Sequence, residues 1–169
     1  MTVRRSIAPL LALFLGLTFL VPASAHAGKP DPIAKAFKGQ LLISVDALPA
    51  PDAEDAKGTI KSYKQLSVKS ITGQVTDGIA TFDFHFMAFM KTKPKSSQLS
   101  LEFYTDDKEK LFVADKRLSG ADPNMTILSS SVRISEDENL NRNRKYVVNL
   151  VAQQGKKSVI LATTKLSTK

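Results

Sequence analysis

The feature that most constrains the fold is a regular succession of strand-like segments separated by turn residues. From residue 37 onward, alternating or apolar stretches follow one another at short intervals, with Gly, Pro, Asn and Asp gathered between them. This pattern is typical of antiparallel sandwiches and barrels. We therefore predict an all-β fold, an antiparallel β-sandwich of about eight strands with an immunoglobulin-like architecture, and a small β-barrel as the alternative. The candidate strands are residues 38–48, 59–76, 79–92, 98–105, 110–118, 125–134, 145–153 and 158–167.

The strongest local signal is the Asp77-Gly78 pair, which favours a two-residue hairpin turn with positive φ at both positions. Pairing continued outward from this turn would place Ser70 opposite His85 and Val68 opposite Met87. Phe82 and Phe84 then share one buried face, whereas further along the opposite face is also apolar, at Met87 and Phe89. This indicates either a bulge or a strand covered on both faces, as in a strand that passes between two sheets.

Residues 1–27 have the pattern of a secretory signal peptide. Arg4 and Arg5 precede a short apolar run from residue 7 to residue 21, and small residues follow, with cleavage expected after Ala25 or Ala27. Residues 28–36 form an N-terminal segment, and the stretch 31–37 is the one helix candidate, of one or two turns. Residues 37–169 are expected to form a single β-sandwich domain, with 49–55 as an exposed loop.

The composition narrows the function. The chain has no cysteine, which excludes disulfides, thiolate metal sites and lipid attachment through cysteine. With export predicted, we expect a periplasmic protein, or an extracellular one as the alternative. No second apolar run follows the first, so we expect a protein that does not span the membrane. Nucleic acid is not an expected partner, because the chain has no Trp, three Tyr and no recognition-helix pattern.

The formal net charge of +8 favours an anionic partner, and we expect the partner to be an envelope protein or an anionic glycan. Two basic segments, residues 91–95 and residues 142–145, are candidate contacts. Lysine and proline in such segments also protect strand edges from aggregation. The candidate partner-binding residues are Lys91, Lys93, Lys95, Arg142, Arg144 and Lys145.

His85 and Met87 resemble the His-x-Met element of periplasmic copper chaperones. Imidazole and thioether donors favour copper over hard cations. The remaining spaced Met and His ligands of those chaperones are missing from this sequence. The principal interpretation is therefore that Met87 packs in the core and His85 lies at its polar rim, with no cofactor; copper bound by His85 and Met87 is the alternative.

No set of nucleophile, base and orienting group can be assembled, and G-x-S-x-G and phosphate-loop motifs are missing. We therefore expect no enzyme activity. The sequence predicts an exported, non-catalytic binding or structural module of the cell envelope, and a periplasmic copper-binding protein using His85 and Met87 as the alternative.

Overall fold

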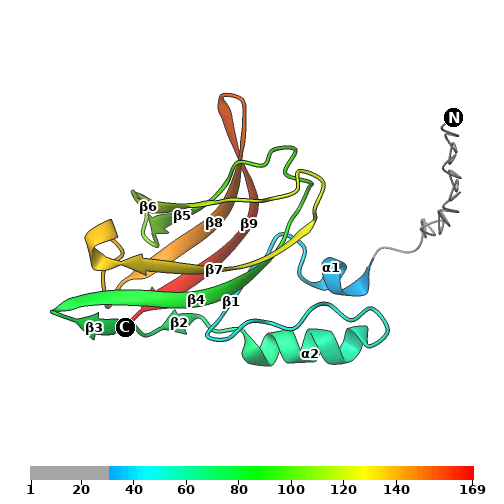
Figure 1. The fold of residues 1–169 in the computed structure, drawn as a ribbon, viewed down its shortest axis with the longest axis horizontal. Coiled ribbons are helices and arrows are strands. Elements are labelled where there is room, and N and C mark those ends of the chain that lie inside the picture. The colour runs from blue at the N-terminus through cyan, green and yellow to red at the C-terminus, as the bar shows by residue number, and fades with distance from the viewer. Residues whose placement is uncertain (1–30) are drawn as a thin grey trace, which may run out of the picture.

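The computed structural model describes residues 31–169, so the predicted signal peptide lies outside the described residues. Antiparallel strands dominate this part of the chain, and two short helices precede most of them (Figure 1). The elements are α1 (Pro32–Ala36), β1 (Leu41–Ser44), α2 (Ala56–Leu66), β2 (Ser70–Ile71), β3 (Gln74–Thr76), β4 (Ile79–Phe89), β5 (Leu99–Thr105), β6 (Phe112–Leu118), β7 (Ile127–Ser135), the 3-10 helix η1 (Glu136–Glu138), β8 (Lys145–Gln154) and β9 (Lys157–Thr168).

The strands form two sheets that face each other. In the first sheet β4 is central, with β1 and β3 along one edge and β7 along the other. The second sheet has the order β2-β9-β8-β5-β6, in which only the β2–β9 pairing is parallel. A single apolar core lies between them and takes side chains from β1, β4, β5, β7, β8 and β9. The predicted all-β, antiparallel class is confirmed.

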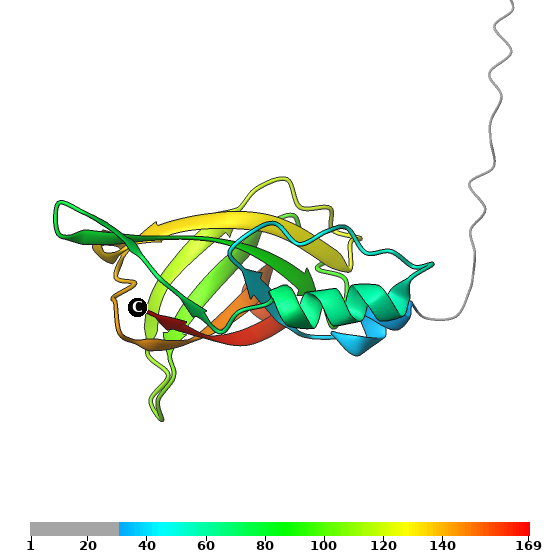
Figure 2. The ribbon, with the colours of Figure 1, turned by 90° about the horizontal axis from the view of Figure 1, so that it is seen from below.

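The sheets also approach each other at their edges. On one side, Gln40 and Thr163 form an isolated parallel bridge, and the Thr163 amide donates to the Gly39 carbonyl over 3.1 Å. On the other side, Lys116 of β6 forms an ion pair with Glu138 of η1. Figure 2, seen from below, shows the β4–β7 pair lying across the strands of the second sheet.

The hairpin at Asp77-Gly78 forms as predicted, with φ of 51° and 84° at these residues and Thr76 opposite Ile79. The predicted continuation of this pairing is wrong. Beyond Gln74 the chain leaves β4, and β1 takes the vacated edge, so that Ser44 lies opposite His85 and Leu42 opposite Met87.

Residues 59–76 were predicted as one long strand, and this is wrong because residues 56–66 form helix α2. The Asp55 carboxylate accepts a hydrogen bond from the Gly58 amide over 3.0 Å, which caps the helix. Thr59 and Tyr63 lie four residues apart and are the buried side chains of the helix. The sequence predicts a strand here because β-branched and aromatic residues are enriched in strands. Helix α1 lies within the segment for which the sequence predicts one or two helical turns.

The part of β4 that has apolar residues on both faces is covered on both faces. The sequence predicts this cover as one of two explanations for the pattern. Its second cover is helical, so the idea that the strand passes between two sheets is wrong. Phe89 packs against Phe37 and Tyr63, with ring centroids 5.2 Å and 6.0 Å away, and Met87 joins this second cluster. Burial of these large side chains is what holds the two helices against the sheet.

Candidate functional site

The two predicted basic segments lie at opposite ends of the molecule. Lys91, Lys93 and Lys95 directly follow the end of β4, whereas the Arg142 guanidinium donates to the Gly78 carbonyl, at the start of β4, over 3.1 Å. The eleven residues of β4 separate these points by roughly 35 Å. One compact ligand group cannot contact both segments at once.

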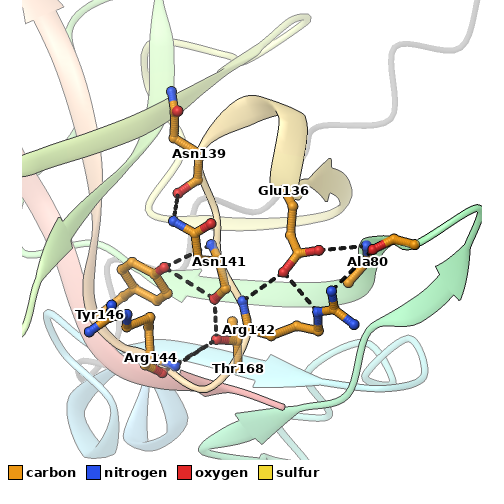
Figure 3. A network of polar contacts seen from close by, with 9 residues as sticks. Ala80, Glu136, Asn139, Asn141, Arg142, Arg144, Tyr146 and Thr168 are labelled. Carbon is orange, nitrogen blue, oxygen red and sulfur yellow. Dashed lines mark hydrogen bonds and ion pairs between the residues drawn. The ribbon is translucent and has the colours of Figure 1, made fainter.

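The end that holds Arg142 is closed by internal polar contacts (Figure 3). The Glu136 carboxylate accepts from the Arg142 Nε over 2.8 Å, from the Arg142 amide over 3.1 Å and from the Ala80 amide over 2.9 Å. The hydrogen bond from the Arg142 side chain is the main reason that the pKa of Glu136 is lowered to about 2. Arg142 thus ties η1 to the β3–β4 turn, which is a structural role.

A second set of bonds in Figure 3 fixes the C-terminal strand at this end. The Tyr146 hydroxyl accepts from the Asn141 amide over 2.9 Å and donates to the Asn141 carbonyl over 3.2 Å. The Thr168 hydroxyl donates to the same carbonyl over 2.6 Å and accepts from the Arg144 amide over 3.3 Å. Burial is the main cause of a raised pKa at Tyr146. Arg144 and Lys145 remain exposed beside this network.

The opposite end carries the lysines of the 91–95 segment, all three exposed. The Gln154 side chain donates to the Pro94 carbonyl over 2.6 Å, which joins this segment to the β8–β9 hairpin. The hairpin projects beyond the sheet next to the loop that follows β4 (Figure 1). Its turn carries exposed Lys156, and exposed Lys157 begins β9. Sequence reasoning missed these two lysines, although their place in a Gly-containing turn was a usable signal. We call the set Lys91, Lys93, Lys95, Lys156 and Lys157 the lysine end.

The lysine end has no acidic partners in the part of the chain that the structure describes. The ion pairs formed by residues 31–169 within 4.0 Å use Lys116, Arg133, Arg142 and Lys165 as their basic members. None of these belongs to the lysine end. All five lysines are exposed, and none forms an ion pair within 4.0 Å to a carboxylate of residues 31–169, so this end concentrates charge of one sign.

The structure separates the environments of the two predicted copper ligands. Met87 is 2 % exposed and lies in the apolar cluster beneath the helices. His85 is half-buried in a shallow surface depression, beside Arg133, which forms a bidentate ion pair with Asp83. Across residues 31–169 no group of three or more His, Cys, Asp or Glu side chains is placed to hold a metal ion.

Within residues 31–169, no helix is both long enough and apolar enough to cross a membrane.

The comparisons with known proteins give little further information. No family model matches the chain, and no curated protein matches it. Among solved structures, it is similar to the CARDB domain of a Pyrococcus furiosus protein, an immunoglobulin-like β-sandwich crystallised in complex with di-metal ions. The two chains are 8 % identical over 78 % of this chain and 90 % of that domain, with a TM-score of 0.30. A similarity this low supports no conclusion about metal binding or function in this chain.

Proposed function

We propose that the protein is an exported, non-catalytic binding module of the cell envelope, periplasmic rather than extracellular, and that its lysine end contacts an anionic glycan. The observation that carries the proposal is the meeting of two lysine-bearing segments at one end, with no ion pair to a carboxylate from residues 31–169. Charge of one sign on exposed loops attracts a polymer of the other sign and speeds its association.

The residue types at the lysine end favour a glycan over a protein partner. Protein interfaces are enriched in aromatic residues, Met and Arg, and depleted in Lys. The segments 91–95 and 155–157 carry lysines but no arginine, methionine or aromatic residue. Lysine is a flexible point charge, and it suits anionic groups that are spaced along a polymer rather than fixed in one plane.

Non-catalytic binding is favoured by the surroundings of His85. In strand register its neighbours are Ser44 of β1 and Ser131 of β7. The Ser44 hydroxyl donates to the Asp46 carbonyl, and Asp83 is held by Arg133. A histidine needs a hydrogen-bonded nucleophile and an orienting carboxylate to act as a base in acyl transfer, and this arrangement supplies neither.

A pull-down from the host's own envelope fraction tests the proposal. The protein, purified as its host makes it, should retain acidic polysaccharide at low salt. A variant carrying Lys93→Gln, Lys95→Gln, Lys156→Gln and Lys157→Gln should lose most of it. The control, Arg144→Gln with Lys145→Gln, removes two charges at the other end and should retain the polysaccharide. Equal loss in both variants would contradict a specific role for the lysine end, and recovery of a stoichiometric protein without polysaccharide would contradict the glycan assignment.

A further inference from the structure

The outer face of the second sheet carries side chains in rows that follow from the strand registers. β5 pairs with β6 on one side and with β8 on the other, and β8 pairs with β9. One face of these strands fills the core, so the alternate residues line the outside. Each row has one residue from each strand, in the order β6, β5, β8 and β9. The three rows are Arg117–Ser100–Val151–Ile160, Asp115–Glu102–Asn149–Thr163 and Phe112–Tyr104–Val147–Lys165.

A shallow depression of about 490 Å³ lies over these rows. Apolar groups of Val147, Val151 and Ile160 line it, and Val151 is only 2 % exposed although it belongs to the outer face. Lys91 and Lys110 also line the depression. Lys91 thereby connects it to the lysine end.

The position of Lys91 depends on Gly39. A Cβ at residue 39 would lie 2.7 Å from the Lys91 Cε, and φ at Gly39 is +78°. Glycine accepts both the positive φ and the close approach. The stem of Lys91 therefore lies across the backbone of Gly39, which directs the side chain along the sheet.

Asn149 supplies an unpartnered polar group to the depression. It is 9 % exposed, and its Oδ1 accepts a hydrogen bond from the Thr163 hydroxyl over 2.7 Å. Its amide nitrogen has no hydrogen-bond partner among residues 31–169. Within residues 31–169, the Ser70 hydroxyl is the only solvent-inaccessible side-chain polar atom that lacks a hydrogen-bond partner. The Asn149 amide nitrogen also lacks a partner, but it is not among the solvent-inaccessible atoms. The Asn149 amide nitrogen therefore reaches the surface, and the depression that Asn149 lines is where it is accessible.

Glu102 supplies an acceptor next to this donor. It is the direct cross-strand neighbour of Asn149, and such neighbours have Cβ atoms about 5 Å apart. The Tyr104 hydroxyl donates to the Glu102 Oε2 over 2.7 Å, and no lysine of residues 31–169 lies within 4.0 Å of its carboxylate. The depression thus presents a fixed acceptor, a fixed donor, an aromatic ring and two ammonium groups above an apolar floor.

This combination matches a sugar ring that carries an anionic group. A hydroxyl is both a donor and an acceptor, so neighbouring sugar hydroxyls can bond to a carboxylate and to an amide at once. The C–H face of a sugar can pack on an aromatic ring and on aliphatic side chains. Ammonium groups at the rim bind the charge.

We propose that this depression is a binding subsite for one acidic saccharide unit, with its hydroxyls on Glu102 and Asn149, its ring against Tyr104 and Ile160, and its anionic group on Lys91 or Lys110. That the ligand is an anionic glycan rests on the proposed function. The depression adds which saccharide unit of that glycan is bound and which residues bind it.

The test is a ¹H–¹⁵N NMR titration of the labelled protein, purified as its host makes it, with trigalacturonate and with its fully methyl-esterified form. Trigalacturonate should shift the side-chain NH₂ signals of Asn149 and the amides of Glu102 and Tyr104. The ester keeps the hydroxyls and loses the charge, so it should bind about tenfold more weakly at low salt. Equal affinity for both forms would overturn the acidic class of ligand, and absence of shifts at Asn149 and Tyr104 at about 10 mM sugar would overturn the site.

Two variants separate recognition from folding. Asn149→Ala removes the donor, and Glu102→Gln removes the acceptor charge at a half-buried position; each should weaken trigalacturonate about tenfold. Lys93→Gln with Lys95→Gln should leave the Asn149 shifts in place. Shifts confined to Lys93, Lys95 and Lys156 would support the proposed function and overturn this subsite, whereas shifts confined to the depression would do the reverse.

Discussion

Glu136 and Arg142 form a two-point clasp: the Glu136 Oε1 accepts from both the side-chain Nε and the backbone amide of Arg142, over 2.8 Å and 3.1 Å. The second carboxylate oxygen accepts from the Ala80 amide, so one side chain connects η1, the loop before β8 and the first residues of β4. The sequence predicts Arg142 as a partner contact, and in the fold its side chain also connects η1 to the β3–β4 turn.

The clasp should make stability depend on pH. The pKa of Glu136 is lowered from 4.5 to about 2, so the contribution of the clasp is present above about pH 4.5 and is lost as the pH falls toward 2. Glu136→Gln should therefore lower the melting temperature at pH 7, with a difference from the wild type that narrows below pH 4.5. Circular dichroism melts at a series of pH values measure this, with Glu109→Gln in an exposed turn as the control. A difference that stays constant down to pH 2 would contradict the account.

The aromatic cluster beneath the helices should carry much of the stability of the N-terminal part. Phe89→Ala should lower the free energy of unfolding by about 3–5 kcal/mol, because it leaves a cavity between Phe37 and Tyr63. Tyr63→Phe should cost about 1 kcal/mol, through loss of the 2.7 Å hydrogen bond from its hydroxyl to the Pro49 carbonyl. Urea titrations of both variants check the order. A larger loss for Tyr63→Phe than for Phe89→Ala would show that the cluster is wrongly described.

Gly39 and Gly78 offer a matched pair for the placement of Lys91. Both have positive φ, but a Cβ at Gly78 meets nothing within 4 Å. Alanine at either position should lower the free energy of unfolding by about 1–2 kcal/mol, because a Cβ disfavours positive φ. Only Gly39→Ala should displace Lys91, and it should therefore weaken trigalacturonate binding in the same titration. If both variants bound trigalacturonate with the same affinity, Lys91 would not contribute to binding at the depression.

Two substitutions test the copper alternative. Met87→Ala should lower the free energy of unfolding by about 2–5 kcal/mol because Met87 is a buried core residue. His85→Ala, at a half-buried position, should change it by about 0.5 kcal/mol or less. We expect Cu(I) and Cu(II) to leave the melting temperature of the wild type unchanged. A copper-dependent rise that His85→Ala removes would establish the alternative.

Short-range signals in the sequence were enough to predict much of the sheet structure. The Asp77-Gly78 turn and the alternation of Leu99, Leu101 and Phe103 depend on neighbours in the chain, and the structure has both. The predicted core position of Met87 is also found.

Features that depend on distant segments were not predictable from the sequence. Helix α2 was mistaken for a strand because Thr59 and Tyr63 suit either structure, and the choice is made by packing on Phe37 and Phe89. The lysine end needs the contact between Gln154 and Pro94, which lie 60 residues apart. The pairing of Asn149 with Glu102 needs the register of two strands that are not consecutive in the chain.

The central claim is that the lysine end binds an anionic glycan, and the most direct measurement is the salt dependence of binding to acidic polysaccharide purified from the host's envelope. Exposed charges are screened over about 8 Å at physiological ionic strength, so the dissociation constant of the wild type should rise steeply between low and moderate salt. The variant with Lys93→Gln, Lys95→Gln, Lys156→Gln and Lys157→Gln should bind weakly with a shallow dependence, and the Arg144→Gln, Lys145→Gln control should match the wild type. Salt-independent binding, or the same steep dependence in all three proteins, would contradict the account.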